Sequence, residues 1–148
     1  MPILLFPCTV REQVLEQHAE LRPLLNEAVS LCEGASERDA GRLFELARAI
    51  HLRFRAHLAY EDDALQPVLA VLDSWGPERV RSLYEDHLRQ RRSLDGLLAT
   101  FQVQGDVARL AGALRRLAQD LLDDMVDEEQ GCLSAPQMSA EILTIERR

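Results

Sequence analysis

HLAYEDDALQP, at residues 57–67, is the first of two related segments in this chain. A weaker copy of it, DMVDEEQGCLS, occupies residues 124–134, and aligning the two copies places Glu61 on Glu128. Each copy also carries a ligand-type residue one helical turn before its glutamate. The chain therefore contains two similar halves, and self-similarity of this kind indicates a repeated structural unit.

A lone histidine stands upstream of each copy at a similar distance, His18 before the first and His87 before the second. Each half thus has the pattern of a helical hairpin that offers ligand-type side chains at matching places. Two such hairpins make a four-helix bundle, and bundle cores hold metal pairs through carboxylates and histidines that project inward from facing helices. The pattern therefore predicts a two-metal site inside a helical bundle.

The composition fits one all-helical domain. The chain has 148 residues, of which 47% are hydrophobic and 5% aromatic, and it contains few glycines and prolines. This length is sufficient to bury a core. We expect a single domain over residues 1–148 with its core at about 9–132. A formal charge of −8 argues against a nucleic-acid partner.

The sequence contains neither a convincing targeting segment nor a membrane span. The opening MPILLFP is apolar but short and has no basic region, unlike a signal peptide, and no run approaches transmembrane length. We expect a soluble cytoplasmic protein without a membrane partner. The cysteines Cys8, Cys32 and Cys132 lack metal-type spacing and are expected to be reduced. Each cysteine is expected to be a small, buried, apolar residue. A redox role stays open for Cys8 and Cys132, since either could lie near a helix end.

Helical periodicity and its stop signals predict four long helices. Thr9 and Glu12 have the spacing of a capping box, Asp106 is a predicted N-cap, and Gly131 is a predicted helix stop. Pro67 is expected to kink the second helix. The predicted helices span residues 9–32, 37–72, 77–103 and 106–129, and a short helix is expected from residue 136. Short connections favour antiparallel neighbours, so we predict an all-α up-down-up-down four-helix bundle with a short C-terminal tail.

The candidate ligands lie on the apolar seams of these helices. His57 and Glu61 continue a seam that runs through Ile50 and Phe54, so both take core positions on one helix face. His51 falls off that seam, and we interpret it as a surface histidine. The seams of all four helices give six candidate metal ligands, which are His18, His57, Glu61, His87, Asp124 and Glu128.

Three of these six residues are carboxylates, and burying an ionised carboxylate without a partner costs on the order of several kcal/mol. A pair of divalent cations would neutralise the carboxylates and take neutral imidazoles as ligands. Taken singly, a buried histidine is more often a hydrogen-bonded core residue, and the H-x-x-x-E spacing is also that of an ordinary side-chain pair. The duplication of the pattern favours the metal site.

Charged residues beside the seams are expected to lie outside the ligand set. Four acidic side chains near the seams are expected either to be solvated or to stand behind the ligands without binding metal. They are Asp62, Asp63, Asp127 and Glu129. Three basic neighbours on the third helix fit a solvated face: Arg89, Arg91 and Arg92.

These residues resemble the hemerythrin-like, or HHE cation-binding, family over about residues 9–134. The resemblance rests on EQHAELRPLL around His18, HLAYEDDALQP around His57, EDHLRQ around His87 and DMVDEEQGCLS around Glu128. It implies a four-helix bundle with a non-haem di-iron centre that binds dioxygen or responds to oxygen, nitric oxide, peroxide or iron status.

By that resemblance, Glu61 and Glu128 would bridge two iron ions. His18 and His57 would ligate them from the first hairpin, and His87 from the second. Manganese or zinc are alternative metals for such an oxygen-rich site. The expected partner is a small diatomic or peroxide ligand, and the sequence identifies no protein partner.

The chain departs from the family pattern at Asp124, where the family has histidine, and it lacks a second histidine one turn from His87. With Asp124 as a ligand, three anionic groups would favour the ferric state and lower the reduction potential, so reversible oxygen carriage is not expected. A one-residue change of helix phase would place Asp123 inward instead, and a degenerate site with one metal or none stays open.

The leading hypothesis is therefore a di-iron protein that senses, binds or scavenges oxygen, nitric oxide, peroxide or iron. One alternative is a carboxylate-rich di-metal enzyme with oxidase or peroxidase-like activity, although the sequence identifies no general acid and no substrate pocket. Another is a metal-free helical interaction module in which the polar core residues only bond to one another. Metal content and turnover of peroxide or oxygen distinguish these three hypotheses.

Overall fold

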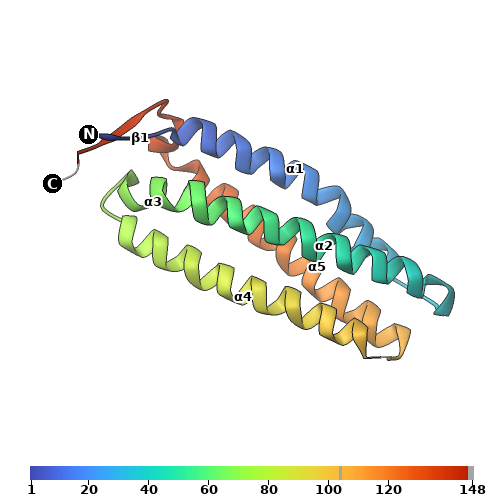
Figure 1. Cartoon of the computed structure of the whole chain (residues 1–148). Coiled ribbons are helices and arrows are strands. Elements are labelled where there is room, and N and C mark those ends of the chain that lie inside the picture. The colour runs from blue at the N-terminus through green and yellow to red at the C-terminus, as the bar shows by residue number, and fades with distance from the viewer. Residues whose placement is uncertain (104, 147–148) are drawn as a thin grey trace.

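Four helical rods form an antiparallel up-down-up-down bundle in the computed structural model, which describes residues 1–103 and 105–146 (Figure 1). The rods are α1 (Pro7–Cys32), then α2 (Ala40–Tyr60) continued by η2 (Glu61–Leu65) and α3 (Gln66–Leu72), then α4 (Gly76–Gln102), and finally α5 (Val107–Gln130). The predicted all-α bundle is confirmed. The expectation of one domain over residues 1–148 stays a prediction, and residues 104, 147 and 148 lie outside the described part.

The helix ends follow local chemistry, with one correction. Asp106 caps α5 as predicted, because its carboxylate accepts a hydrogen bond from the Ala108 backbone N–H at 3.0 Å. Gly131 ends α5, also as predicted. The predicted capping box at Thr9 is wrong, since α1 already begins at Pro7. Proline suits the first helical position because its missing N–H would have no intrahelical partner there.

The second rod contains a π-helical turn, η2, which begins at Glu61. The backbone N–H of Gln66 bonds to the carbonyl of Glu61, five residues earlier. The sequence predicts a single helix kinked at Pro67, whereas the structure places a wider turn directly before that proline. Proline lacks an N–H to donate, so the regular helical hydrogen bond is missing at Pro67. A π turn accommodates one extra residue and is frequent at functional sites. The turn lies where the second rod carries Glu61 into the core.

Two short strands join the ends of the described chain, and the sequence analysis did not predict them. β1 (Ile3–Leu5) pairs antiparallel with β2 (Leu143–Ile145), with Ile3 opposite Ile145. Three-residue strands carry little periodic signal, and this pairing is non-local. The tail between α5 and β2 forms the 3₁₀ turns η3 (Cys132–Ser134) and η4 (Pro136–Ser139), the second at the place where a short helix was expected.

The apolar core is divided into two clusters. One cluster, which includes Leu25, Ile50 and Leu114, fills the bundle toward the connection between α1 and α2. The other, which includes Val14 and Leu133, lies under the terminal strands and the 3₁₀ turns. The predicted metal ligands lie between the two clusters, so apolar side chains cover them from both ends. Among the described helices, none has the length and apolar character needed to cross a bilayer.

Gly76 determines how closely the second and third rods approach at their connection. A Cβ at this position would lie 2.2 Å from the Ala70 carbonyl oxygen, so the backbone of α3 would have to move. Gly96, on the exposed face of α4, has nothing within 4 Å of its equivalent Cβ position. The close approach at Gly76 therefore helps to hold the helices that carry Glu61 and His87.

Gly76→Ala should lower the free energy of unfolding by about 1–3 kcal/mol, since the added methyl group overpacks against backbone. Gly96→Ala should raise it by up to about 1 kcal/mol, because alanine is the better helix former. Urea denaturation monitored by circular dichroism measures both. Equal effects of the two substitutions would contradict the close approach of α3 and α4.

Candidate metal centre

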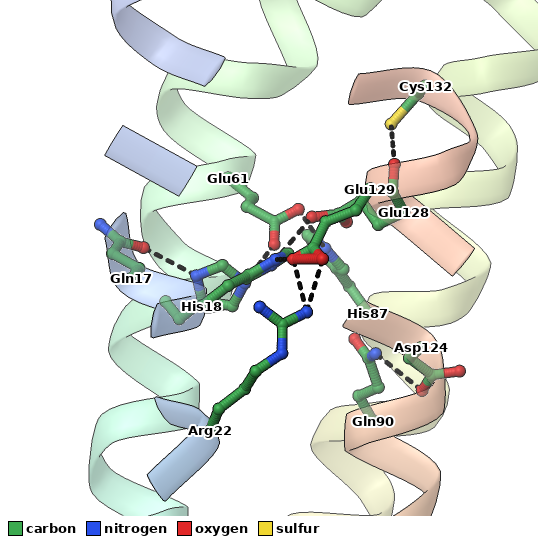
Figure 2. A network of polar contacts seen from close by, with 11 residues as sticks. Gln17, His18, Arg22, Glu61, His87, Gln90, Asp124, Glu128, Glu129 and Cys132 are labelled. Carbon is green, nitrogen blue, oxygen red and sulfur yellow. Dashed lines mark hydrogen bonds and ion pairs between the residues drawn. The ribbon is translucent and has the colours of Figure 1, made fainter. Parts of the chain in front are cut away.

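Three histidines and two glutamates from all four rods converge between the apolar clusters. Figure 2 labels His18, Glu61, His87 and Glu128 among them. His18 comes from α1, His57 from α2, Glu61 from η2, His87 from α4 and Glu128 from α5. Each of the three histidines and Glu61 exposes at most 4% of its surface. The ligand atoms of His18, His57, Glu61 and Glu128 all lie within 4.8 Å of one another.

Glu61 lies in the middle of this group. One of its carboxylate oxygens contacts Nε2 of His57, and the other is 3.5 Å from Nε2 of His87. On the opposite side, Nε2 of His18 is 3.3 Å from a carboxylate oxygen of Glu128. Glu61 therefore connects groups from both halves of the bundle, and this is the position a bridging carboxylate would need.

Several inward-facing atoms of this group have no hydrogen-bond partner among the described residues. They are Nε2 of His18, Nε2 of His87, Oε2 of Glu61 and Oε1 of Glu128. Leaving a buried polar atom unpaired costs about 1–3 kcal/mol. Imidazole nitrogens and carboxylate oxygens are also the donor set that suits iron, manganese and zinc. The residues therefore fit a bound metal.

The outer nitrogen of each histidine is held by a hydrogen-bond acceptor. Nδ1 of His18 lies 2.7 Å from a carboxylate oxygen of Glu129, and Nδ1 of His87 lies 2.6 Å from one of Asp62. Because a carboxylate only accepts, it places the Nδ1 proton on the outside and leaves the Nε2 lone pair available on the inside. This arrangement is typical of metal-binding histidines.

Arginines at the surface donate hydrogen bonds to the carboxylates of Glu129 and Asp62. Arg22 donates to the two oxygens of Glu129 at 2.5 and 2.6 Å, and Arg91 donates to Asp62 at 2.5 Å. Of the two readings that the sequence left open for Asp62 and Glu129, these contacts favour charges that stand behind the candidate ligands over solvated ones. The prediction that Arg91 belongs to a merely solvated face is wrong, because its guanidinium fixes a carboxylate that in turn orients His87.

The third histidine, His57, is oriented by an amide. Its Nδ1 lies 2.7 Å from Oε1 of Gln17, which accepts the ring proton. Gln17 carries no signal in the sequence pattern other than its position directly before His18. His51 lies away from the group, 2.9 Å from a carboxylate oxygen of Asp95, as its off-seam position predicted.

Asp124 is not brought into the group of converging ligand atoms. Its carboxylate accepts hydrogen bonds from Gln90 at 3.0 Å and from Arg89 at 3.1 Å, and its side chain is 25% exposed. The physical reason is the phase of α5, in which Met125, at 2% exposure, takes the inward position. The alternative, Asp123, is exposed and accepts from Gln119. Direct ligation by Asp124 stays a prediction.

The two central glutamates, Glu61 and Glu128, have pKa values that are shifted in opposite directions. Burial, together with the charge of Glu61, raises the pKa of Glu128 to about 8. Burial acts in the same direction on Glu61, but the nearby ring nitrogens of His57 and His87 outweigh it and hold the pKa of Glu61 well below its usual range. Without metal, protons therefore remain in the centre at neutral pH.

The pKa values of two histidines are also raised. Burial lowers the pKa of His18, but the nearby carboxylates of Glu128 and Glu129 outweigh this effect. Burial likewise opposes the rise at His87, and the carboxylates of Glu61 and Asp62 outweigh it. Metal ligation requires an unprotonated Nε2, so binding would displace these protons.

Cys132 lies beside the site, but its thiol is expected to be unreactive. Burial, and then the charges of Glu128 and Glu61, raise the pKa of its thiol to about 12. A thiol that stays protonated is a poor nucleophile. The redox role left open for Cys132 therefore has no support in its surroundings, and the residue acts as a small packed side chain.

Two spaces adjoin the ligands. A space of about 10 Å³ lies among His18, His57, Glu61 and Glu128, and Gln90 and Asp124 also line it. This volume is comparable to that occupied by a single water molecule or ion. A larger cavity of about 340 Å³ lies between α4 and α5, and its lining includes Arg79, His87, Gln90, Asp124, Glu128 and Cys132. The larger cavity offers a small molecule a route to His87.

Comparison with known proteins yields one match. The family described as "Hemerythrin HHE cation binding domain" matches residues 9–135, which contain every ligand candidate named above. No curated protein and no solved structure matches the chain.

The stability of the metal-free protein should fall as pH rises between about 6 and 8. Glu128, His18 and His87 have raised pKa values in the folded state, so folding holds protons that the unfolded chain releases. The stabilisation is present at low pH and lost through the folded-state pKa, by up to about 1.4 kcal/mol per pH unit for each proton. Chemical denaturation of chelator-treated protein at several pH values measures this slope.

Glu128→Gln should flatten that dependence, because an amide resembles the protonated carboxyl group and binds no proton in this range. Glu20→Gln, at an exposed position on α1, is the control and should keep the wild-type slope. The extra stability conferred by metal should grow with pH, since loading releases the same protons. A metal-free stability that rises from pH 6 to 8 would contradict the assignment.

Proposed function

The chain belongs to the hemerythrin HHE cation-binding domain family, and from this premise we propose that it holds two iron ions. Their ligands would be His18, His57, Glu61, His87 and Glu128. The observation that carries this proposal is the set of buried nitrogen and oxygen atoms that face one another without hydrogen-bond partners. Their number and convergence exceed what an ordinary polar core leaves unpaired.

Each ligand has a distinct part in this proposal. Glu61 would bridge, because its two oxygens approach histidines from different halves of the bundle. Glu128 would bridge from the opposite side, next to His18. The outer carboxylates make the histidines more basic and fix their orientation, and such partners typically change metal affinity by about 10–100-fold.

We further propose that the site senses, binds or scavenges oxygen, nitric oxide or peroxide. When bound, the iron pair supplies an open coordination position and a change of oxidation state. The cavity between α4 and α5 supports access for a small ligand, because it reaches His87 and is lined by polar groups. The surrounding apolar clusters limit access for bulk water, which favours small uncharged or weakly acidic ligands.

Protein expressed with supplementary iron should contain about two metal ions per chain, as in other paired carboxylate–histidine bundle sites. Glu61→Ala should reduce this to below one, since it removes the group that approaches both histidine sets. Elemental analysis of the purified protein measures the content. His51→Ala is the matched control, because His51 lies away from the group and should leave the content unchanged. Well under one metal ion in the wild-type protein would refute the proposal.

The reduced, iron-loaded protein should respond to oxygen or peroxide with a change in its absorption spectrum that saturates within about one turnover per site. We expect no sustained turnover, because the groups that hold protons in the metal-free centre, Glu128, His18 and His87, would serve as ligands in the loaded protein and would have released those protons. Absorption spectroscopy with stepwise additions of peroxide, with and without excess reductant, measures this. Sustained peroxide consumption at the loaded site would favour the oxidase or peroxidase-like alternative.

A further inference from the structure

A three-part chain of contacts occurs three times around the centre. In two of these chains an inward histidine is held by a carboxylate, and an arginine holds that carboxylate from the surface. These two are His18 with Glu129 and Arg22, and His87 with Asp62 and Arg91. The third chain has the same outer parts, a carboxylate and an arginine, but its inward member is a glutamine.

That third chain consists of Gln90, Asp124 and Arg89. Nε2 of Gln90 donates to Asp124 at 3.0 Å, and Arg89 donates to the same carboxylate at 3.1 Å. A carboxylate can only accept hydrogen bonds, so the amide nitrogen must face Asp124. The amide oxygen must therefore face the other way, and Figure 2 shows it on the side of His87.

The oxygen of Gln90 is buried and unpaired. The residue exposes only 6% of its surface, and within the described part of the chain Oε1 finds no hydrogen-bond partner. A glutamine that served only to fill the core would leave an acceptor unsatisfied at a cost of about 1–3 kcal/mol. This oxygen shares that condition with the inward atoms of His18, Glu61, His87 and Glu128.

The position of Gln90 matches this role. It follows His87 by three residues on α4, and this spacing places both side chains on one face of a helix. Gln90 lines the small space among the ligands together with Glu61 and Glu128. It also lines the larger cavity between α4 and α5 together with His87. Gln90, Asp124 and Glu128 line both spaces.

We propose that Oε1 of Gln90 is a cation ligand at the position beside His87, and that Asp124 and Arg89 orient it without ligating. This inference rests on the proposed function and deepens it. It gives Asp124 a positioning role in place of the direct ligation that its seam position suggested. The carboxylate holds the amide so that an oxygen lone pair, and not an N–H, faces the cation.

The two cation positions then differ in chemistry. The position beside His18 and His57 has two imidazoles, whereas the position beside His87 has one imidazole and a neutral amide oxygen. Carbonyl and carboxylate oxygens suit harder divalent cations such as manganese, and imidazoles suit iron and zinc. The position beside His87 is therefore the weaker one for iron and the one at which manganese(II) competes best.

Calorimetric titration of metal-free protein with iron(II) under argon, and separately with manganese(II), tests this inference. The wild-type protein should show two binding steps. Gln90→Leu, which removes the oxygen at similar volume, should weaken the second step at least tenfold and leave the first unchanged. Asp124→Asn should also weaken the second step, because asparagine can donate to the amide oxygen and let the Gln90 amide turn over.

Gln119→Leu is the matched control. Gln119 donates to Asp123 at 3.0 Å in the same kind of amide–carboxylate pair, but on the exposed face of α5, so both steps should persist. Urea unfolding of metal-free Gln90→Leu supplies a readout independent of metal. Its stability should equal or exceed that of the wild-type protein, because an unpaired buried oxygen has been removed.

The outcomes separate this inference from the proposed function. A wild-type protein that binds neither cation overturns both. Two steps of unchanged affinity in Gln90→Leu overturn the role of Gln90 and leave the proposed function intact. Loss of the second step in Asp124→Asn but not in Gln90→Leu would make Asp124 the ligand and overturn the inference. Lower stability of metal-free Gln90→Leu, with both steps retained, would assign Gln90 a structural role only.

Discussion

Two carboxylates, those of Glu61 and Glu128, face each other in a space that apolar clusters close from both ends. Like charges at this separation in a low-dielectric interior cannot both persist without compensation. The protein supplies that compensation either with protons, as the raised pKa of Glu128 indicates, or with cations. The polar groups around the centre answer this requirement, since the apolar layers remove much of the water that would otherwise screen the charges.

The compensation is arranged in layers. Three inward nitrogens meet the carboxylates, and acceptors on the outer side of the rings keep each nitrogen correctly oriented. Arginines at the surface then neutralise the outer carboxylates, so that the orienting groups do not add further negative charge to the centre. Positive charge thus remains at the periphery, and the interior is left with groups that can exchange protons for metal. A bundle suits this design because four helices can each contribute one inward residue with its outer partner on the same or an adjacent helix.

The sequence predicts much of this arrangement, because duplication and helical period are both local signals. The bundle, its loops, and the inward positions of His18, His57, Glu61 and His87 all follow from apolar seams with period 3.6. The structure places Asp124 half-buried at the edge of the small space among the ligands, one residue before Met125, which takes the fully buried position after Leu121. Near the end of a seam, a shift of one residue in helix phase decides which of two adjacent side chains points into the core. The sequence pattern does not distinguish between them.

Other features could not be predicted for different physical reasons. Gln17 and Gln90 have amide side chains, which occur both on surfaces and in cores. Their residue type therefore does not indicate which helix face they occupy. The roles of Arg22 and Arg91 depend on carboxylates from other helices and appear only when the rods are packed. The π turn changes the number of residues per turn, which a fixed helical period cannot represent. The pairing of β1 with β2 depends on two segments at opposite ends of the described chain.

That last pairing has a consequence for how the layer that covers the ligands is held in place. Leu133, Met138 and β2 complete the apolar cluster on one side of the ligands, and they come from the segment that follows all four helices. Separation of β1 from β2 would therefore loosen this layer while the four helices and their ligands stay packed. Fraying of so short a strand pair is a local opening that exposes one end of the centre to solvent without unfolding the bundle.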